Sequence, residues 1–454
     1  MQTTTLFQRL LWSCIYLSFL TYAITMVASL WEKFSTHPTV TTLVSSTYPV
    51  SQIPFPGVAV CSTNKISKKR ARLMALHIAN FTKRDPKEIM SLMRYVGQLY
   101  DFDFEISSIS ELLEFQNILD SLQISVTDLA KTIATPCDEL LRNCFWRGFE
   151  INCTDFFFLR RTHQGYCCVF NYVKASNDAT VVIPKYPFTT DAGVENGLYV
   201  SVNNYPRDYY YTTISAPGVM LHVFIPTDFP DKPSGGLTEI LTQPNSENFI
   251  EITPTTMVSV DEVAKYRIEK RECLFDYERD TAFNGIYSQS DCFSECRMKS
   301  IDAMCQCIPF MIPLSNNNTV CTLADIPCLT RYADKWHSHF PEGDTSLHLQ
   351  KEKQDSLRCN QKCYPPCAET VYEAFANSFP IFNQKEKEQN ITRIYVYYLN
   401  RFSKMYRQDV VYYWFEMLSN FGGIFGIFVG WSIISVIQLF DHYLKTALEK
   451  LRNS

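Results

Sequence analysis

The stretch that decides the fold carries two cysteines four residues apart: YSQSDCFSEC, residues 287–296. Serine at the start of such a stretch is typical of a helix N-terminus, so we expect a helix that begins after Ser288 or Ser290. Residues four apart lie on one face of a helix, so Cys292 and Cys296 should point in the same direction. The stretch therefore presents two thiols side by side to a second element.

The chain offers a matching pair, because Cys359 and Cys363 are also four residues apart. The pairs Cys292–Cys363 and Cys296–Cys359 have equal sums of residue numbers, as a regular antiparallel arrangement of two helices requires. Each bridge that closes a long loop contributes about 2–4 kcal/mol. The other cysteines of this region would close the ladder or staple the intervening loop: Cys273 with Cys367, and Cys305, Cys307, Cys321 and Cys328.

Cysteine use over the whole chain indicates an oxidising compartment. Of the 17 cysteines, all but Cys14 lie between Cys61 and Cys367. Zinc sites are the alternative, but the close spacings are CxC and CxxxC, and no histidine lies between residues 273 and 328. The same part of the chain contains four acceptor motifs for N-glycosylation, at Asn80, Asn152, Asn317 and Asn390.

Two apolar segments flank this region. Residues 10–30 are uncharged, and at about 1.5 Å per residue they span the roughly 30 Å of membrane hydrocarbon. A cleaved signal peptide is the alternative for this segment, although the apolar core of a signal is shorter, at about 7–15 residues. Residues 412–440 form the second segment, and residues 417–437 within it are uncharged. We therefore expect two transmembrane helices.

Basic residues lie just outside both segments, at Arg9 and in a modest positive tail at the C-terminal end. The positive-inside rule then places residues 1–9 and 441–454 in the cytosol. Residues 31–411 are extracellular, where disulfides persist. The sequence predicts a multi-pass plasma-membrane protein with a large disulfide-rich α+β ectodomain. A net charge of −5 and the lack of a long basic run argue against a nucleic-acid partner.

Small and polar residues recur along the second segment. Gly422, Gly426 and Gly430 repeat every four residues, so they share a helix face that another helix could approach closely. Polar groups in hydrocarbon are costly unless they face a partner or water. The pattern fits tight packing, and it fits equally a pore whose carbonyls and hydroxyls replace the hydration shell of an ion. A pore requires an oligomer, because one helix cannot enclose it. The polar residues concerned are Asn420, Ser432 and Ser435.

Further stretches carry a resemblance to one channel family. They are IPFPGVAVC at residues 53–61, which is similar to that family's first palm strand, and GYCCVFN at residues 165–171, with two adjacent cysteines before Phe-Asn. Residues 422–441 look like its pore helix, with Gly-Trp-Ser at a Gly-x-Ser selectivity tripeptide. With the cysteines from Cys273 to Cys367, which match its thumb, these motifs resemble the degenerin/epithelial sodium channel family, and most closely its pickpocket-like branch. The resemblance covers nearly the whole chain.

The resemblance implies a trimer of chains with a hand-like ectodomain of palm, finger, thumb, knuckle and β-ball. The finger would occupy about residues 62–160 and the thumb about residues 273–370. It implies a Cys144–Cys153 bridge, and it pairs Cys61 with Cys167 or Cys168, leaving Cys137 for the other. The set that we predict is Cys61–Cys167, Cys137–Cys168, Cys144–Cys153, Cys273–Cys367, Cys292–Cys363, Cys296–Cys359, Cys305–Cys328 and Cys307–Cys321.

The resemblance also implies roles for residues of the second segment. Trp431 is bulkier than the residue that relatives mostly carry at this place, and Gln438 stands where acid-sensing relatives have a glutamate. The implied selectivity filter is Gly430, Trp431 and Ser432. The implied gate is Ser419, Asn420 and Gly423, with Gly422 and Gly426 in helix packing and Gln438 and Asp441 at the inner mouth.

Together these features predict a subunit of an amiloride-sensitive-type sodium channel in the lipid bilayer, gated by a ligand, acid or force. It would conduct Na⁺ as a homotrimer or a heterotrimer with related subunits. The alternative is a non-conducting accessory subunit or truncated isoform, because residues 1–9 lack the family's His-Gly motif and Trp431 is bulky. A two-span ATP-gated channel has another cysteine layout.

We expect neither an enzyme nor a cofactor, because no catalytic motif stands in its usual context. A cluster of histidines in the thumb region could in principle bind a metal. These residues are more simply explained as solvated side chains, so we expect no metal site. They are His337, His339 and His348.

Overall fold

The computed structural model describes residues 6–102, 109–173, 187–279, 286–312, 319–337, 357, 359, 363–382 and 390–452. The chain divides into two compact units. The first comprises residues 1–42, 259–272 and 407–454, and the second comprises residues 43–258 and 273–406.

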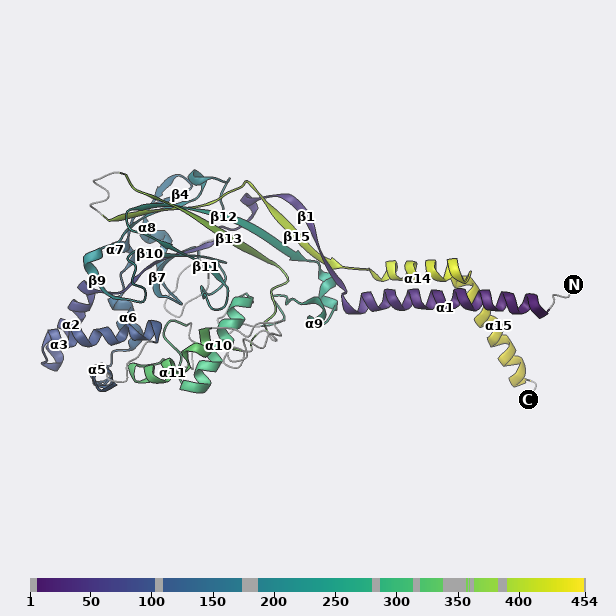
Figure 1. Ribbon diagram of the computed structural model, residues 1–454, viewed down its shortest axis with the longest axis horizontal. Helices are drawn as coiled ribbons and strands as arrows, with labels where there is room; N and C mark the ends of the chain where they lie inside the picture. Colours follow the sequence, from purple (N-terminus) through teal and green to yellow (C-terminus); the bar gives the residue numbers. More distant parts are fainter. Residues whose placement is uncertain are drawn as a thin grey trace. The chain divides into compact units, whose positions relative to one another are not determined.

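Helices dominate the first unit. Helix α1 (Leu6–Thr36) lies beside α14 (Trp414–Phe428), and α15 (Ile433–Arg452) follows (Figure 1). Among the described residues, Gln8–Thr36 is the one helical stretch that is long and apolar enough to cross a membrane. The second apolar segment is two helices instead of the single helix expected over residues 412–440. A short helix, α9 (Ile268–Arg271), completes the unit.

Two β-sheets form the framework of the second unit. The larger has strand order β1-β15-β12-β14-β8-β4-β5, with β13 on β12, and the smaller has order β11-β10-β2-β7-β6. Strands β3 and β9 pair separately. Their bounds are β1 Thr39–Pro49, β2 Gly57–Ser62, β3 Asn64–Ser67, β4 Leu141–Trp146, β5 Phe149–Ile151, β6 Phe157–Thr162, β7 Gly165–Phe170, β8 Leu198–Asn203, β9 Tyr209–Thr212, β10 Val219–Phe224, β11 Leu237–Thr242, β12 Ser246–Ser259, β13 Glu369–Pro380, β14 Ile391–Tyr398 and β15 Phe402–Val410.

Helices of the second unit follow the expected local signals. Ser67 caps α2 by accepting from the Arg70 N–H at 3.3 Å, and Ser288 caps α10 by accepting from the Asp291 N–H at 3.1 Å. Ser288, rather than Ser290, therefore opens the helix that carries the paired cysteines. The helices are α2 Lys68–Thr82, α3 Pro86–Leu92, α4 Gln98–Asp101, α5 Ile109–Ser121, α6 Val126–Ile133, α7 Cys137–Leu140, α8 Cys153–Phe156, α10 Gln289–Cys305 and α11 Ile326–His337.

The motif at residues 53–61 supplies the centre of the core. It leads into β2, the middle strand of the smaller sheet, and a strand buried on both faces must be apolar throughout. Phe55 is fully buried and packs edge-on against Trp146 at 4.9 Å between ring centroids and against Tyr398 at 5.5 Å. Gly57 is needed because a Cβ there would lie 2.6 Å from the Phe224 ring.

Eight disulfides staple the second unit, and they join the same pairs of cysteines as the predicted set. Cys359 and Cys363 bond to α10, and neither of these two residues is itself in a helix. The bridges are Cys61–Cys167, Cys137–Cys168, Cys144–Cys153, Cys273–Cys367, Cys292–Cys363, Cys296–Cys359, Cys305–Cys328 and Cys307–Cys321. Cys14 is free.

Helix α10 buries polar residues alongside apolar ones such as Met298 and Ile301. Arg297 pairs with Asp231, a carboxylate with no exposed surface that also accepts from Ser294 at 2.8 Å. Asp291 accepts from the Phe229 N–H at 2.9 Å. These contacts fix the helix to the loop that connects β10 and β11.

Candidate functional site

The candidate site is the interruption between α14 and α15. Helix α14 ends at Phe428, and residues 429–432 leave the helix before α15 begins at Ile433. Gly430 has a φ of 73°, which L-residues rarely adopt and which often ends a helix. The three residues of the implied filter thus lie together in the non-helical connection.

Local contacts stabilise the non-helical connection at both of its ends. The N–H groups of Val429 and Trp431 both donate to the Phe425 carbonyl, at 3.0 and 3.3 Å. The Trp431 ring stacks on the Phe425 ring at 6.4 Å between centroids. The hydroxyl of Ser432 accepts from the Ser435 N–H at 3.2 Å and so caps α15. The side chains of Trp431 and Ser432 therefore already have partners in their own chain.

The packing of α14 on α1 places the interruption along the first apolar segment. The Phe428 ring contacts Tyr22 at 5.0 Å and Phe19 at 6.2 Å between centroids. Both residues lie near the middle of Gln8–Thr36. The break therefore occurs level with the middle of the α1 span.

The implied gate and packing residues lie on α14. Ser419, Gly422 and Gly423 are exposed in the single chain, and Asn420 is half-buried. In the part of the chain that the structure describes, no atom outside the local backbone of α14 lies within 4 Å of a Cβ built on Gly422 or Gly423. This face has room for another helix, and α1 does not fill it.

The N-terminal end of α14 is well fixed. Its first turn is closed by a capping box between Tyr413 and Glu416, and the Tyr413 hydroxyl donates to Asp409 at 3.0 Å. The helix thus begins at a defined residue.

The implied inner-mouth residues lie on α15. Gln438 and Asp441 are both exposed in the single chain. Asp441 forms an ion pair at 2.6 Å with Lys445, which lies one helical turn further along α15. Both side chains are more than half exposed. Such an exposed pair contributes little to stability. It does offset the carboxylate charge at this end of the helix.

The structure brings the filter residues together and spreads the others along two helices. Sequence reasoning missed the helix break, although the positive φ belongs to one of the three glycines that the spacing singled out. Of the glycosylation acceptors, Asn80 and Asn152 are exposed and Asn390 is half-buried. Asn317, His339 and His348 lie outside the described residues.

Comparison with known proteins identifies the family. The sequence pattern of the amiloride-sensitive sodium channel family matches residues 1–442. Pickpocket protein 19 of Drosophila melanogaster is 25% identical over 446 residues, which cover 96% of this chain and 85% of the relative. Sodium channel protein Nach of the same fly is 23% identical, covering 97% and 83%. The gamma subunit of the Xenopus laevis epithelial sodium channel is 22% identical, covering 83% and 57%.

One solved structure, of a proton-activated chloride channel, aligns over 93% of both chains with 8% identity and a TM-score of 0.31. That likeness is too weak to carry an argument. The family match, in contrast, extends from the first residue to the middle of α15. The chain therefore belongs to the amiloride-sensitive sodium channel family of membrane ion channels, among its pickpocket-like members.

Proposed function

We propose that the chain is a subunit of a sodium-conducting channel whose pore is lined by the second apolar segment. Three chains would surround the pore, as homotrimer or heterotrimer. Gly430, Trp431 and Ser432 would form its narrowest part. Both termini would lie in the cytosol, and the disulfide-bonded unit would stand outside the cell.

The helix break is the observation that carries this proposal. A break leaves backbone N–H and C=O groups without helical partners, which costs several kcal/mol per group in lipid. Non-helical backbone at membrane depth is tolerated where it is buried in protein or lines water. Residues 430–432 are exposed in the single chain and lie level with Tyr22 of α1. A water-filled pore between chains supplies the water that these groups need.

The other residues of the segment fit the same arrangement. The open face at Gly422 and Gly423 would receive helices of neighbouring chains, because no described part of its own chain fills it. Ser419 and Asn420, between two and three turns nearer the ectodomain than the break, would form the gate. Gln438 and Asp441 would line the inner mouth, where a carboxylate attracts cations.

The test is expression of the full chain alone in Xenopus oocytes, with sodium current recorded before and after Ser419→Val. A larger side chain at the gate should hold the channel open and raise the resting current. Ser29→Val is the matched control, because Ser29 is an exposed serine on α1, away from the break. An amiloride-sensitive current that rises with Ser419→Val and not with Ser29→Val supports the proposal. If neither the wild type nor Ser419→Val gives a current when expressed alone, and co-expression with a related subunit gives one, a homomeric channel is ruled out.

A non-conducting accessory subunit is the second candidate, and Trp431 is the feature that favours it. A bulky ring in the filter could close it. The contact with Phe425 argues the other way, because it gives the ring a partner in its own chain. Replacement of Trp431 by serine separates the two: a current that appears only in Trp431→Ser would assign the block to this ring.

A further inference from the structure

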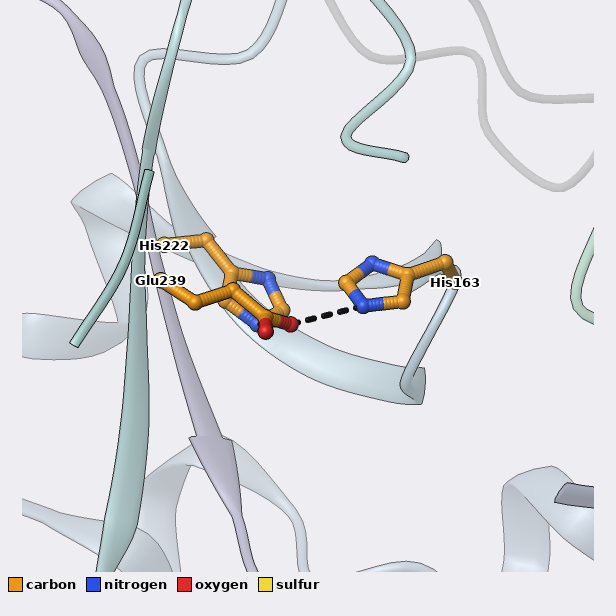
Figure 2. A group of neighbouring side chains, drawn as sticks. All are labelled: His163, His222 and Glu239. Carbon is orange, nitrogen blue, oxygen red and sulfur yellow. Dashed lines mark hydrogen bonds and ion pairs between the residues drawn. The ribbon is translucent and has the colours of Figure 1, made fainter. Parts of the chain in front are cut away.

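A cluster of three metal-ligating side chains lies in the smaller sheet, far along the sequence from the second apolar segment. His222 on β10 stands directly opposite Glu239 on β11 in the register of the two strands. His163 comes from the turn between β6 and β7. One nitrogen or oxygen atom of each residue lies within 4.8 Å of the other two (Figure 2).

Contacts at both ring nitrogens fix the orientation of the His163 ring. Its Nδ1 lies 3.1 Å from the Pro230 carbonyl oxygen, and its Nε2 lies 2.8 Å from Glu239 Oε1. A carbonyl that accepts from Nδ1–H leaves Nε2 as the nitrogen that can bind a metal, which is the usual support of a metal-binding histidine. The ring also stacks on His222 at 4.9 Å between centroids.

His222 is the unusual member, because it has no exposed surface and its Nε2 makes no hydrogen bond. That nitrogen lies 3.4 Å from Glu239 Oε1, and Nδ1 lies 3.7 Å from the sulfur of Cys61. Burial lowers the pKa of His222 to about 4, helped by His163 and Lys65. The buried ring therefore presents Nε2 to the Glu239 carboxylate.

Glu239 completes the cluster as an ionised carboxylate. Burial would raise the pKa of Glu239, but its contacts with His163, His222 and Lys232 outweigh that effect and hold it well below the ordinary value. Lys232 binds the other oxygen, Oε2, at 2.5 Å. Oε1 is thus directed towards the two rings.

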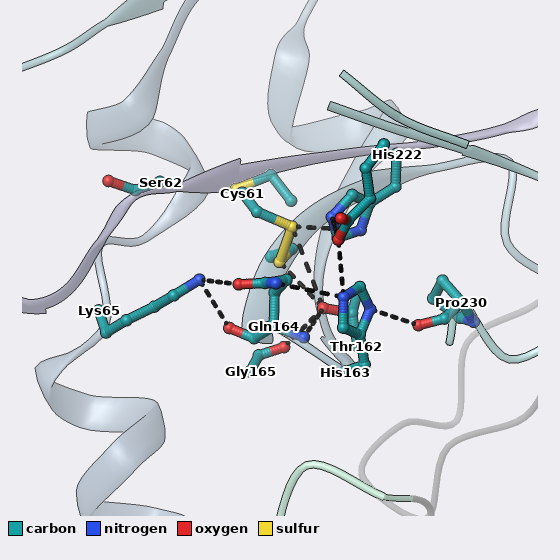
Figure 3. The surroundings of a disulfide bond; sticks show 12 residues. Cys61, Ser62, Lys65, Thr162, His163, Gln164, Gly165, His222 and Pro230 are labelled. Atoms are coloured by element: carbon teal, nitrogen blue, oxygen red, sulfur yellow. Dashed lines mark hydrogen bonds and ion pairs between the residues drawn. A yellow bond between two sulfur atoms is a disulfide. The ribbon is translucent and has the colours of Figure 1, made fainter. Parts of the chain in front are cut away.

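A second lysine lies behind the cluster without reaching the carboxylate. Lys65 Nζ donates to the backbone and side-chain oxygens of Gln164, at 3.0 and 2.7 Å (Figure 3). Burial lowers the pKa of Lys65 to about 7, and Glu239 opposes the shift. The cluster thus contains one carboxylate with two lysines near it, which limits how strongly it can attract a cation.

We propose that His163 Nε2, His222 Nε2 and Glu239 Oε1 form a binding site for a divalent transition-metal ion of the Zn²⁺ class. Two imidazoles and a carboxylate are a common ligand set for zinc with an open fourth position. Metal–ligand distances of about 2.0–2.2 Å place tetrahedral ligands about 3.3–3.5 Å apart. The separations of 2.8 and 3.4 Å about Glu239 Oε1 need only small side-chain shifts to reach these values.

The fourth position opens into a cavity. His163 and Glu239 line a space of about 270 Å³ whose other walls include Arg297 of α10 and Trp336 of α11. Water fills the fourth position there, since the cavity is large enough for several molecules. The ion ties the β6–β7 turn to β10 and β11, and Lys232 keeps its affinity moderate.

The site is tested on the purified full chain in detergent, with disulfides intact and no histidine tag. Co²⁺ is the probe, because its visible absorbance reports imidazole and carboxylate ligation, and Zn²⁺ is added to displace it. We expect one ion per chain and an affinity at least about tenfold weaker in His163→Gln and in Glu239→Gln. His77→Gln is the control, because His77 is exposed on α2.

Two results would overturn the proposal. One is a wild-type chain that binds neither Co²⁺ nor Zn²⁺ at 1:1 stoichiometry, a result that needs no variant to fold. The other is equal binding by wild type, His163→Gln and Glu239→Gln. Size-exclusion profiles identify a misfolded variant, and the remaining variant then decides. The readout is independent of ion conduction, so a failed channel assay leaves this test unaffected.

Discussion

Substitution of Gly430 tests whether the backbone conformation at the break matters for permeation. Its φ of 73° lies in the left-handed region, and among the described residues no atom beyond its chain neighbours is within 4 Å of a Cβ placed there. The effect of alanine is therefore conformational and not steric within the chain. An L-residue in this conformation costs about 1–2 kcal/mol, a factor of about 5–30 in the population of the broken segment.

Asparagine separates conformation from size. It is larger than alanine but tolerates the left-handed region better, so Gly430→Asn should perturb the break less than Gly430→Ala. Gly235 is a matched control in the second unit, with a φ of 77° and equally open surroundings. Gly235→Ala carries a similar backbone cost away from the proposed pore.

The assay is the ratio of sodium to potassium permeability and the current amplitude in oocytes with equal surface expression. We expect the loss to be largest for Gly430→Ala and smaller for Gly430→Asn, with Gly235→Ala unchanged. A greater loss with asparagine would mean that space between chains, rather than backbone conformation, constrains this position. Unchanged permeation in both Gly430 variants would refute the role of the break.

Three more predictions concern the second unit. Arg297→Met leaves the buried Asp231 carboxylate unpaired and should lower the free energy of unfolding by about 3–5 kcal/mol in urea titrations. Lys299→Met on the same helix removes a lysine whose side chain is 67% exposed and should therefore cost less than Arg297→Met. Burial would raise the pKa of Asp231, but the Arg297 guanidinium and the bound hydroxyls hold this pKa below its ordinary value. The ionised carboxylate therefore stabilises the fold above about pH 4, and this contribution is lost as the pH falls further. The difference in unfolding free energy between wild type and Asp231→Asn should accordingly shrink below about pH 4. Asn80→Gln and Asn152→Gln should each remove one glycan, seen as a faster band on gels before but not after glycosidase treatment; unchanged mobility would contradict an extracellular location.

Part of the disulfide framework could be predicted from cysteine spacing, whereas the bridges Cys61–Cys167, Cys137–Cys168 and Cys144–Cys153 were implied only by the family resemblance. Two pairs of cysteines at helical spacing, with equal sums of residue numbers, give the antiparallel register of Cys292–Cys363 and Cys296–Cys359. The structure forms these bonds although Cys359 and Cys363 are not helical.

The helix break could not be predicted from spacing. Gly422, Gly426 and Gly430 are equivalent in a repeat of four, yet only Gly430 among them has a positive φ. Glycine permits both conformations at little cost, so the surrounding contacts decide which it adopts. Those contacts include the hydroxyl of Ser432, which caps α15 by accepting from the Ser435 N–H.

The cluster of His163, His222 and Glu239 could not be predicted from the sequence for a different reason. His163, His222 and Glu239 meet because β10 pairs with β11 in one particular register. A shift of that register by one residue would turn one partner to the other face of the sheet. The twelve residues that connect the two strands do not specify this register by any short turn motif.

The reversal potential of the current tests the central claim most directly. Currents of oocytes that express the full chain are recorded in normal medium and after the external Na⁺ concentration is lowered tenfold, with a large organic cation in its place. A sodium-selective pore predicts a shift of about 59 mV towards negative potentials. A reversal potential that does not change when external sodium is replaced, but shifts when external chloride is changed, would contradict the account.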